Sequence, residues 1–436
     1  SLISSPLVVR AAPGRSALTL GKVNWPALRP RVVAAELKRL REVLPIEELW
    51  LVDPDAHRLE LVSGVSRRMF ARAGHPGVIH ATSDVVAGVE NADIVLLQLR
   101  IGGQAARHGD ETWPHLAGVI GQETTGPGGF AKALRTVPVV LDIAEQVRRH
   151  AKPDAWIIDF TNPVGIVTRA LVSAGHRAVG LCNVAIGFQR RFAAMLDVDF
   201  HDVQLDHVGL NHLTWERGVT VGGRNALPEL LASHLGDLAE EVELPPDLLS
   251  LLGSVPSYYL RYFYSHDQVL REQLGSPTRA EAVMEVEAEL LRLYADPHVD
   301  TKPAILEKRG GAYYSEAAVD LIASLVSDRR DVQVVNIRND GALPFLPDDH
   351  VIEVPATVGS AGLTALPIAP LPDDLAGLIA DVAGYERLAL DAAVNGGRDR
   401  VLRAMVAHPL VRQFDRAEKL TDLLIAENSR HLAWTR

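Results

Sequence analysis

One thiol and one imidazole are the side chains of this sequence that most directly suggest metal chemistry. Cys182, the single cysteine of the 436 residues, lies in the apolar run VGLCNVAIG, and His212 ends the motif HVGLNH. A thiolate and an imidazole together favour a borderline or transition metal over magnesium or calcium. A lone cysteine in an apolar run is also explained as a small core residue, and sequence spacing does not show that the two side chains meet.

Amide and phenol groups near these two residues could bind or deprotonate a substrate. Asn183 follows Cys182, and Asn162 stands in DFTNPVG before a proline that can open a helix. Asn162 could therefore cap that helix instead of binding a ligand. The segment PSYYLRYFY (256–264) holds four tyrosines. A phenol becomes a base if a cation or metal lowers its pKa from about 10, and otherwise such a stretch forms an amphipathic core.

Two arginines lie in glycine-containing segments and could bind an anionic group. Arg100 belongs to LRIGGQAARHGDE (99–111), directly after an apolar run, and Arg309 belongs to KRGGAYYSEAA (308–318). A guanidinium holds phosphate or carboxylate with two hydrogen bonds, although Arg100 could equally form a surface ion pair. The segment IGQETTGPGG (120–129) is too rich in glycine for a core element, so we expect a loop, either functional or a plain connector.

An ordered succession of elements must position these residues. In the first half, short apolar runs alternate with helical patterns, which is typical of an open, mostly parallel sheet with right-handed crossovers. The predicted strands are ELWLVD (48–53), GVIHATSD (77–84), ADIVLLQLR (92–100), DAWIIDFTN (154–162) and HRAVGLCN (176–183). Such a sheet gathers functional groups at the carboxyl ends of its strands.

The pattern changes after about residue 190. The expected elements there are paired strands over 203–223, helices over 244–275, and a helix followed by a strand over 317–340. A chain of this length is expected to form about two domains. We therefore predict an α/β protein with a Rossmann-like dinucleotide-binding domain over 1–190 and a mixed α/β (α+β) domain with substrate and metal groups over 191–436.

The first two strands give conflicting indications of a dinucleotide site. Asp53 closes ELWLVD, where an acidic residue would accept ribose hydroxyl protons, although it could also be a turn residue in VDPD. The first turn of such a domain normally holds a G-x-G-x-x-G sequence, and residues 1–31 contain none. Gly21, after the possible first strand SALTL (16–20), permits a turn, but Lys22 beside it would crowd a pyrophosphate.

Composition argues against several other classes of protein. Hydrophobic residues make up 47% and charged residues 23%, and the net charge of −11 argues against a general nucleic-acid binder. A single cysteine cannot build a disulfide scaffold, and no apolar run is long enough for a membrane span. Since no segment is of signal-peptide type, we expect a cytoplasmic protein whose partner is a small molecule, with no nucleic acid or membrane partner.

In their order along the chain, these motifs resemble those of glycoside hydrolase family four, the NAD- and metal-dependent glycosidases, and most nearly its 6-phospho-β-glucosidase branch. The resemblance runs from about residue 45 to the C-terminus and is carried by ELWLVD, GVIGQETTGPGGFAKALRTVPVVLDI, DFTNPVGIVT, GLCNVAIG, VGLNHL, YLRYFY, KRGGAYYSEAA and VVNIRNDGALPFLP. The combination of GQETTGPGG with GLCN and GLNH is the most specific part. The first residues lack the family's glycine- and serine-rich nucleotide loop, and Ala185 replaces a usual proline.

The resemblance implies a glycosidase that does not use the common pair of catalytic carboxylates. Bound NAD+ would take a hydride from C3 of the sugar, a tyrosine would remove the C2 proton, and a divalent metal, most often Mn2+, would stabilise the enediolate. The aglycone would leave by elimination before water adds and the hydride returns. The implied substrate is a phosphorylated disaccharide or aryl glucoside, and the implied assembly is a homodimer or homotetramer, with oligomer contacts in the second domain.

The resemblance also implies roles for several of the residues introduced above. Cys182 and His212 match the metal ligands, and Asn162 and Asn183 match positions that contact the sugar near the metal. Tyr259 is the implied base. Tyr258 and Tyr262 are further candidates for the base. Arg100 and Arg309 are assigned to the 6-phosphate from charge and loop position more than from motif, and Asp53 and Gly21 are assigned to NAD from their places after the first two predicted strands.

Three other interpretations fit part of the sequence. One is a catalytically impaired relative that binds sugar phosphates but has a defective NAD loop. Another is a glycosidase of the same family that acts on a different sugar, such as an α-glucoside, an α-galactoside or a uronide. The third is an ordinary 2-hydroxy-acid dehydrogenase, which fits the sheet but leaves GLCN and GLNH unexplained.

Overall fold

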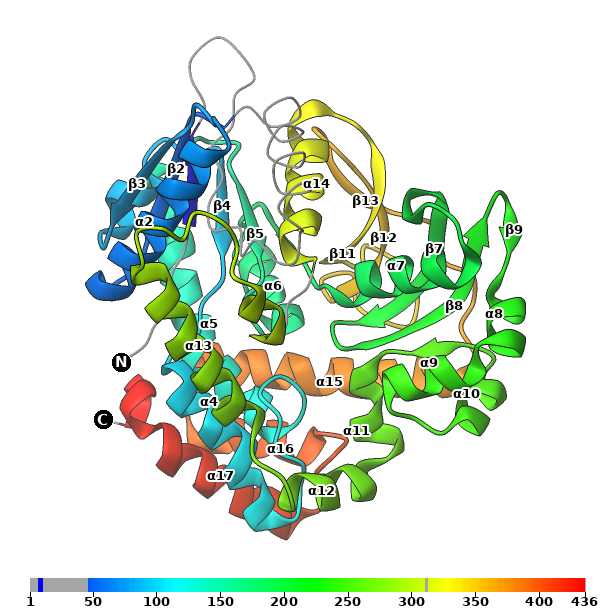
Figure 1. Cartoon of the computed structure of the whole chain (residues 1–436). Helices are drawn as coiled ribbons and strands as arrows, with labels where there is room; N and C mark the ends of the chain where they lie inside the picture. The colour runs from blue at the N-terminus through cyan, green and yellow to red at the C-terminus, as the bar shows by residue number, and fades with distance from the viewer. Residues whose placement is uncertain (1–6, 11–45, 310–312, 436) are drawn as a thin grey trace.

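A mixed β-sheet runs through the whole molecule (Figure 1). The computed structural model describes residues 7–10, 46–309 and 313–435. Within these ranges the sheet has 13 strands in the order β10-β8-β7-β12-β11-β6-β5-β4-β1-β2-β3, with β13 paired to β12 and β9 paired to β8. A parallel part in the first half and an antiparallel part in the second confirm the predicted α/β fold class.

The parallel part follows the predicted apolar runs. Its strands are β2 (Glu48–Val52), β3 (Val78–Thr82), β4 (Ile94–Leu97), β5 (Trp156–Asp159) and β6 (Ala178–Gly180). The helices between them are α2 (Ala56–Arg72), α3 (Val85–Val89), α4 (Gly103–Thr112), α5 (Pro127–His150) and α6 (Val164–Ser173). All four residues of β4 are buried, because such a sheet is covered on both faces.

Strand β1 (Leu7–Arg10) departs from the parallel order. It lies between β2 and β4 and is antiparallel to both. Its carboxyl end therefore points toward the opposite edge of the sheet from the carboxyl ends of β2 to β6. The predicted first strand over 16–20 and Gly21 lie outside the described residues.

The second half of the sheet is antiparallel. Its strands are β7 (Val203–Leu210), β8 (Leu213–Val221), β9 (Arg224–Asn225), β10 (Val255–Pro256), β11 (Asp331–Arg338), β12 (Val351–Gly359) and β13 (Gly362–Ala365). Strand β11 joins the parallel part by pairing Asn336 with Gly180 of β6. One continuous sheet therefore crosses residue 190, and the division into domains at that point stays a prediction.

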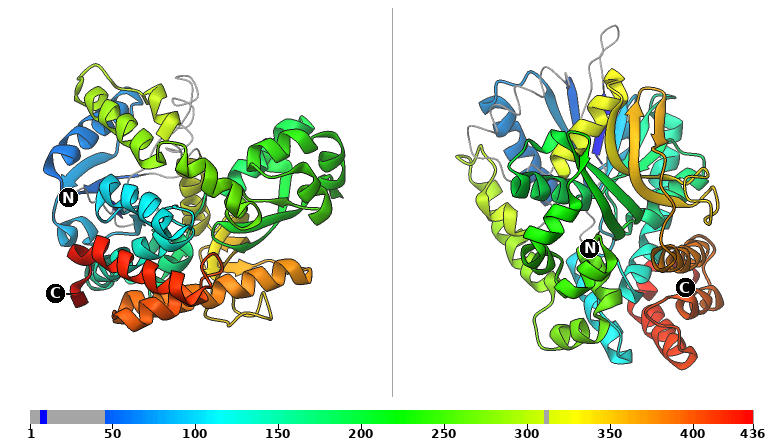
Figure 2. Two further views of the ribbon diagram at one scale, coloured as in Figure 1. Left: turned by 90° about the horizontal axis from the view of Figure 1, so that it is seen from below. Right: turned by 90° about the vertical axis from the view of Figure 1, so that its right-hand side faces the viewer.

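Some helices that follow β6 form a separate lobe, and others cover the rest of the sheet. The lobe, which projects to the right in the left view of Figure 2, packs α7 (Val184–Leu196), α8 (Leu227–Ser233), α9 (Leu235–Val242) and α10 (Pro246–Leu252) with β7 and β8 around a hydrophobic cluster of its own. The other long helices are α13 (Arg279–Ala295), α14 (Tyr314–Ser327), α15 (Asp373–Asn395), α16 (Arg398–Ala407) and α17 (Phe414–Asn428). Helix α15 packs on α5 and α6, and so brings the C-terminal region against the parallel part.

The segment expected to be helical over 244–275 is interrupted, which corrects that prediction. After α10, strand β10 pairs with β8, and the chain continues as a 3-10 turn (Tyr258–Leu260), α11 (Arg261–Tyr264) and α12 (His266–Leu274). The backbone pairing of Val255 with Glu216 competes with helix formation at this point. Tyr258 and Tyr259 therefore lie in a tight turn and not on a long helix.

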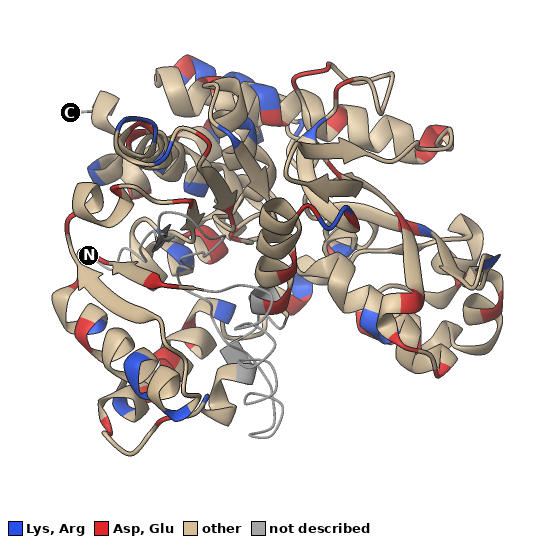
Figure 3. Cartoon of the chain, turned by 90° about the horizontal axis from the view of Figure 1, so that it is seen from above, with Lys and Arg blue, Asp and Glu red and all other residues tan. Residues whose placement is uncertain are grey.

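Charged residues of both signs are mixed along the ribbon (Figure 3). The described residues include no helix with the length and apolar character needed to cross a bilayer.

Asp159, at the end of β5, gives the fold a testable dependence on pH. The carboxyl is fully buried, its Oδ1 accepts from Thr161 N at 2.8 Å, and its Oδ2 lies 3.2 Å from the Thr168 hydroxyl. Burial raises the pKa of Asp159 to about 8. The folded-state pKa exceeds the unfolded value of about 4. The contribution of the protonated Asp159 carboxyl to the free energy of unfolding is therefore fully present below about pH 4 and is lost as pH rises through about 8.

We expect Asp159→Asn, which keeps the shape but cannot ionise, to remove that loss. The variant should be more stable than the natural chain at pH 9 by more than about 1 kcal/mol, and nearly equal to it at pH 4. Urea unfolding at pH 4, 7 and 9 measures the difference. If the free energy of unfolding changes with pH by the same amount in both proteins, Asp159 is already ionised in the folded chain.

Candidate active site

Three predicted site residues follow neighbouring parallel strands. Arg100 comes after β4, Asn162 after β5 and Cys182 after β6. Because β4, β5 and β6 are paired in parallel, their carboxyl ends meet at one edge of the sheet. The sequence expectation that these side chains gather at this edge agrees with the strand order.

A tight turn between β7 and β8 brings His212 to the same region. Leu210 pairs with Leu213, so Asn211 and His212 alone form the turn. His212 has a φ of 63°, in the left-handed region. Gly209 precedes the turn with a φ of 148°, and a Cβ there would lie 2.0 Å from the Leu213 carbonyl oxygen, so only glycine fits.

The protonation of the His212 ring follows from its hydrogen bonds. His212 Nδ1 lies 2.9 Å from Thr124 Oγ1, and the Thr124 hydroxyl donates to Gln122 Oε1 at 2.8 Å. Gln122 Oε1 also accepts from the backbone N–H of Thr124 and Thr125, which identifies it as oxygen. Thr124 Oγ1 must therefore accept from Nδ1–H, and the lone pair of the neutral ring stays on Nε2, where it can bind a metal. Burial lowers the pKa of His212 to about 4, so the ring is neutral near pH 7.

Tyr259 and Cys182 complete the group around His212. The ring of Tyr259 stacks on His212 with centroids 3.6 Å apart and planes 6° from parallel. Cys182 is 6% exposed, and the Asn211 side chain interacts with its thiol and favours the thiolate form. Burial and the charge of Glu353 raise the pKa of Cys182, and burial and the charge of Cys182 raise that of Tyr259. The thiol, imidazole and phenol thus converge, which sequence spacing could not show.

The two asparagines stand beside this group. The side chain of Asn162 does not cap α6, whose N-cap is Pro163, and its buried Oδ1 has no hydrogen-bond partner among the described residues. The alternative that Asn162 caps the helix is therefore wrong. Asn183 is the N-cap residue of α7 without a side-chain capping bond, directly after Cys182. A buried acceptor with no partner indicates a ligand that donates to it.

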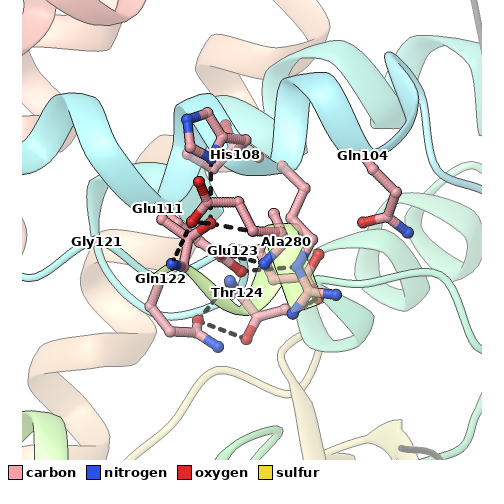
Figure 4. A network of polar contacts seen from close by, with 12 residues as sticks. Gln104, His108, Glu111, Gly121, Gln122, Glu123, Thr124 and Ala280 are labelled. Atoms are coloured by element: carbon pink, nitrogen blue, oxygen red, sulfur yellow. Dashed lines mark hydrogen bonds and ion pairs between the residues drawn. The ribbon is translucent and has the colours of Figure 1, made fainter. Parts of the chain in front are cut away.

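An ion-pair network centred on Glu123, which Figure 4 shows from close by, lies next to the group. Arg100 belongs to this network. Glu123 accepts from both terminal nitrogens of Arg100, from Lys132 Nζ at 2.8 Å, and lies 3.4 Å from Arg107. Although burial opposes ionisation, these cations hold the pKa of Glu123 well below its usual range. Burial, partly offset by Glu123, lowers the pKa of Lys132 to about 7. Arg100 therefore forms the ion pair that was the alternative to an anion site, but its side chain is part-buried, with 20% exposed, and does not lie on the open surface.

Helices α4 and α13 close this network on one side. Glu111 accepts from Arg107 at 2.7 Å and from the backbone N–H of Ala280 at 2.7 Å. Gln104 donates to Glu287 at 2.9 Å. Sequence reasoning did not assign a role to Arg107, Glu123 or Lys132, although all three stand inside the segments quoted above, and charged residues in or beside a glycine-rich loop were the available signal.

The glycines of IGQETTGPGG are explained by close backbone contacts. A Cβ at Gly121 would lie 1.9 Å from the Glu111 carbonyl oxygen, one at Gly128 would lie 2.3 Å from that of Asp110, and one at Gly129 would lie 2.3 Å from that of Thr124. This segment is therefore a packed support for Thr124 and Glu123 and not a plain connector.

The other predicted residues lie farther away or outside the described residues. Tyr258 accepts from Arg261 at 2.9 Å, and Tyr262 is 6% exposed within the core. Gly21 is not described, and Arg309 lies in the 3-10 segment Ala304–Arg309, where its side chain is not described.

Asp53 lies at the carboxyl end of β2, on the edge expected for a dinucleotide. Arg58 donates to Oδ1 and Oδ2 at 2.6 Å each, and the backbone N–H of Asp55 donates to Oδ1 at 2.9 Å. A carboxylate oxygen can accept two hydrogen bonds. Oδ1 accepts two and Oδ2 accepts one, so one acceptor position remains on Oδ2.

The described residues contain no group of three or more histidine, cysteine or acidic side chains arranged to hold a metal. Cys182 and His212 would therefore be two protein ligands, and the other coordination positions would be open to substrate or water. A small hollow beside His212 is lined by Thr125, Asn211, Phe263, Tyr385 and Glu386.

Comparisons with known proteins give one consistent result. Residues 27–198 match the model for the family 4 glycosyl hydrolases, and residues 207–411 match the model for the C-terminal domain of that family. A probable 6-phospho-beta-glucosidase of Bacillus subtilis is 39% identical over 92% of this chain and 94% of its own length, and a 6-phospho-beta-glucosidase of Escherichia coli is 35% identical over 92% and 93%. The crystal structure of the 6-phospho-beta glucosidase of Thermotoga maritima with NAD and glucose-6-phosphate has a TM-score of 0.85 at 30% identity, over 92% of this chain and 96% of that one. A second structure of that protein, with manganese, NAD+ and glucose-6-phosphate, has a TM-score of 0.84.

Two glycine substitutions test the packed loop. We expect Gly129→Ala to destabilise the chain by about 1–3 kcal/mol, because its Cβ must displace the backbone at Thr124. Gly187→Ala is the matched control, since Gly187 lies within α7 and a Cβ there meets no atom within 4 Å. It should leave stability unchanged or raise it by up to about 1 kcal/mol. Thermal unfolding compares the variants, and equal melting temperatures would contradict the close-contact explanation.

Proposed function

The chain belongs to the family 4 glycosyl hydrolases, and we propose that it cleaves 6-phospho-β-glucosides at the group formed by Cys182, His212 and Tyr259. The observation that carries this proposal is the convergence of that thiol, imidazole and phenol beside a buried cation network. Such a group lacks the pair of facing carboxylates of ordinary glycosidases and suits an elimination mechanism. An ordinary 2-hydroxy-acid dehydrogenase has no use for a metal-binding thiol and imidazole.

The cation network supports a phosphorylated substrate. Arg100 and Lys132 share Glu123 as a carboxylate partner, so an incoming dianionic phosphate would meet positive charge that Glu123 does not fully neutralise. The relatives carry the name 6-phospho-beta-glucosidase, and one neighbouring structure holds glucose-6-phosphate. The substrate proposed here is a phosphorylated disaccharide or an aryl 6-phospho-β-glucoside.

The donor set fits a divalent metal. The Cys182 sulfur and His212 Nε2 would bind the metal. Asn162 Oδ1, which has no hydrogen-bond partner among the described residues, would accept a hydrogen bond from a sugar hydroxyl nearby. Two features fit a dinucleotide: the edge at which the parallel strands end, and the acceptor position that remains on Asp53. The turn that would bind the pyrophosphate lies outside the described residues. When bound, NAD+ supplies a hydride acceptor for C3 of the sugar and a metal such as Mn2+ supplies a Lewis acid for the sugar oxygens.

The chain's own residues then position the sugar and move one proton. Tyr259 removes the proton from C2, and its stacking on His212 fixes the direction from which the phenol oxygen approaches. Asn162 and Asn183 bind sugar hydroxyls, and Arg100 binds the 6-phosphate. Thr124 and Gln122 keep the Nδ1–H tautomer of His212. Departure of the aglycone from C1 follows loss of the C2 proton, and addition of water completes hydrolysis.

A second function has one specific observation in its favour. Strand β1 is antiparallel to β2 and β4, and residues 1–31 contain no G-x-G-x-x-G sequence. A dinucleotide fold normally has a parallel first strand followed by that turn. These two features favour a sugar-phosphate-binding relative with impaired NAD binding.

Replacement of the proposed base tests the elimination mechanism. Tyr259→Phe should lower turnover of p-nitrophenyl 6-phospho-β-glucoside by about 10²- to 10⁴-fold, and product formed in D2O should lose its C2 deuterium label. Tyr264→Phe, in the same segment but outside the proposed site, should keep activity within about threefold of the natural chain. Undiminished C2 exchange in Tyr259→Phe would rule out Tyr259 as the base.

Cofactor titration separates the two candidate functions. If the chain is an active glycosidase, calorimetry with Mn2+ present should detect NAD+ binding, and leaving out either NAD+ or metal should abolish turnover. Glucose-6-phosphate binding without any heat from NAD+ would support the impaired relative instead.

A further inference from the structure

A row of buried polar side chains crosses four strands behind Cys182 and His212. Glu216 on β8, His207 on β7, Glu353 on β12 and Asn336 on β11 are each at most 1% exposed. Strand register places His207 opposite Glu216 and Asn336 opposite Glu353. We call these four residues the buried row. The proposed mechanism uses none of them, although burying charged side chains is costly unless they are paired.

His207 is the cation of the buried row. Its Nδ1 lies 2.6 Å from Glu216 Oε1, and its Nε2 lies 3.2 Å from Glu353 Oε1. Each ring nitrogen faces a carboxyl oxygen, an arrangement in which an imidazolium can donate to both. Burial lowers the pKa of His207, but the charges of Glu216 and Glu353 outweigh this effect and raise it to about 10.

Glu353 is the anion whose charge the row does not neutralise. Its Oε2 accepts from Asn211 Nδ2 at 2.8 Å and from Asn336 Nδ2 at 2.9 Å, while Oε1 faces His207. Burial alone would protonate the carboxyl, but these donors hold the pKa of Glu353 below its usual range. Since the charge of His207 offsets that of Glu216, one negative charge remains in the interior at Glu353.

Asn211 connects this charge to the proposed metal ligands. Its amide donates to Glu353 at 2.8 Å, and it immediately precedes His212 in the turn. The Asn211 side chain and the charge of Glu353 both act on the Cys182 thiol. A divalent cation held by one thiolate carries a net charge of one, which Glu353 balances. Groups that hydrogen-bond metal ligands orient them and tune their affinity.

We propose that Glu353, held by His207 and Asn336, is a positioning residue that acts through Asn211 to orient Cys182 and to balance the charge of a divalent cation at Cys182 and His212. This inference rests on the proposed function for the metal site. Glu353 touches neither substrate nor metal in this scheme, and its effect is on metal affinity.

Titration with Co2+ alone provides a test that does not depend on turnover. A cysteine thiolate bound to Co2+ gives a charge-transfer absorption in the near ultraviolet, and Cys182 is the only thiol of the chain. The natural chain should show this band, and Cys182→Ser should abolish it. Absence of the band from the natural chain would overturn the metal site and, with it, the role of Glu353.

Glu353→Gln keeps the shape of the side chain and removes its charge. We expect the Co2+ dissociation constant to rise about 10- to 100-fold, with the band still present at saturation because Cys182 remains the ligand. Glu216→Gln is the matched control at the far end of the row. It also removes a buried carboxylate, but His207 can then release one proton and still donate to Glu353, so the constant should stay within about threefold.

Asn211→Ala breaks the connection at a partly exposed turn and gives a second test if Glu353→Gln does not fold. It should weaken Co2+ binding to the same extent, and in the double variant the two effects should not add, as for residues acting along one path.

If the natural chain shows the band while both single variants bind Co2+ within about threefold of it, the metal site stands and the role of Glu353 is overturned. Equal weakening by Glu216→Gln would also overturn it, because the loss would then follow from disturbing any buried carboxylate.

Discussion

The proposed active site depends on the packing of the His212 ring between Thr124 and Tyr259. Thr124 fixes the Nδ1 side of the ring by a hydrogen bond, and Tyr259 covers one face by stacking. Thr124 comes from the loop before α5, His212 from the hairpin turn between β7 and β8, and Tyr259 from a 3-10 turn, and the sheet brings these segments together. Because Gly129 lets the backbone of the loop approach Thr124 closely, backbone packing far from the ligand atoms controls the orientation of the imidazole.

Two ionised carboxylates in the interior have opposite surroundings. Glu123 is surrounded by Arg100, Lys132 and Arg107, so its neighbourhood suits an added anion. Glu353 is held by one imidazolium and two amides, so its neighbourhood suits an added cation. A 6-phosphate and a divalent metal are the two charged partners of the proposed reaction, and the interior provides a complementary charge for each.

Much of the fold follows from sequence because local pattern and strand order agree. The apolar runs of β2 to β6 are short and continuous, as parallel strands covered on both faces require, and the residues after them could be assigned to one edge. Prediction failed where contacts distant in sequence decide the structure. Pairing of β10 with β8 interrupts the expected helices, and the ion pair of Arg100 with Glu123 joins two segments that are 23 residues apart. The helix-capping alternative for Asn162 failed because Pro163 occupies the N-cap.

The amino-acid pattern alone specifies the residue types that follow each parallel strand, the glycine-rich loop and the presence of a single thiol. Those features limit the chemistry to a thiol, an imidazole, amides and phenols at one edge of a sheet. Which nitrogen of His212 is open to a ligand follows from the folded arrangement, since it depends on hydrogen bonds with Gln122 and Thr124. The fold also brings Glu353 into contact with Asn211, the residue before His212, because β12 pairs antiparallel with β7 at Gly209. Hydrogen bonds between residues so far apart in sequence leave no periodic pattern from which they could be read.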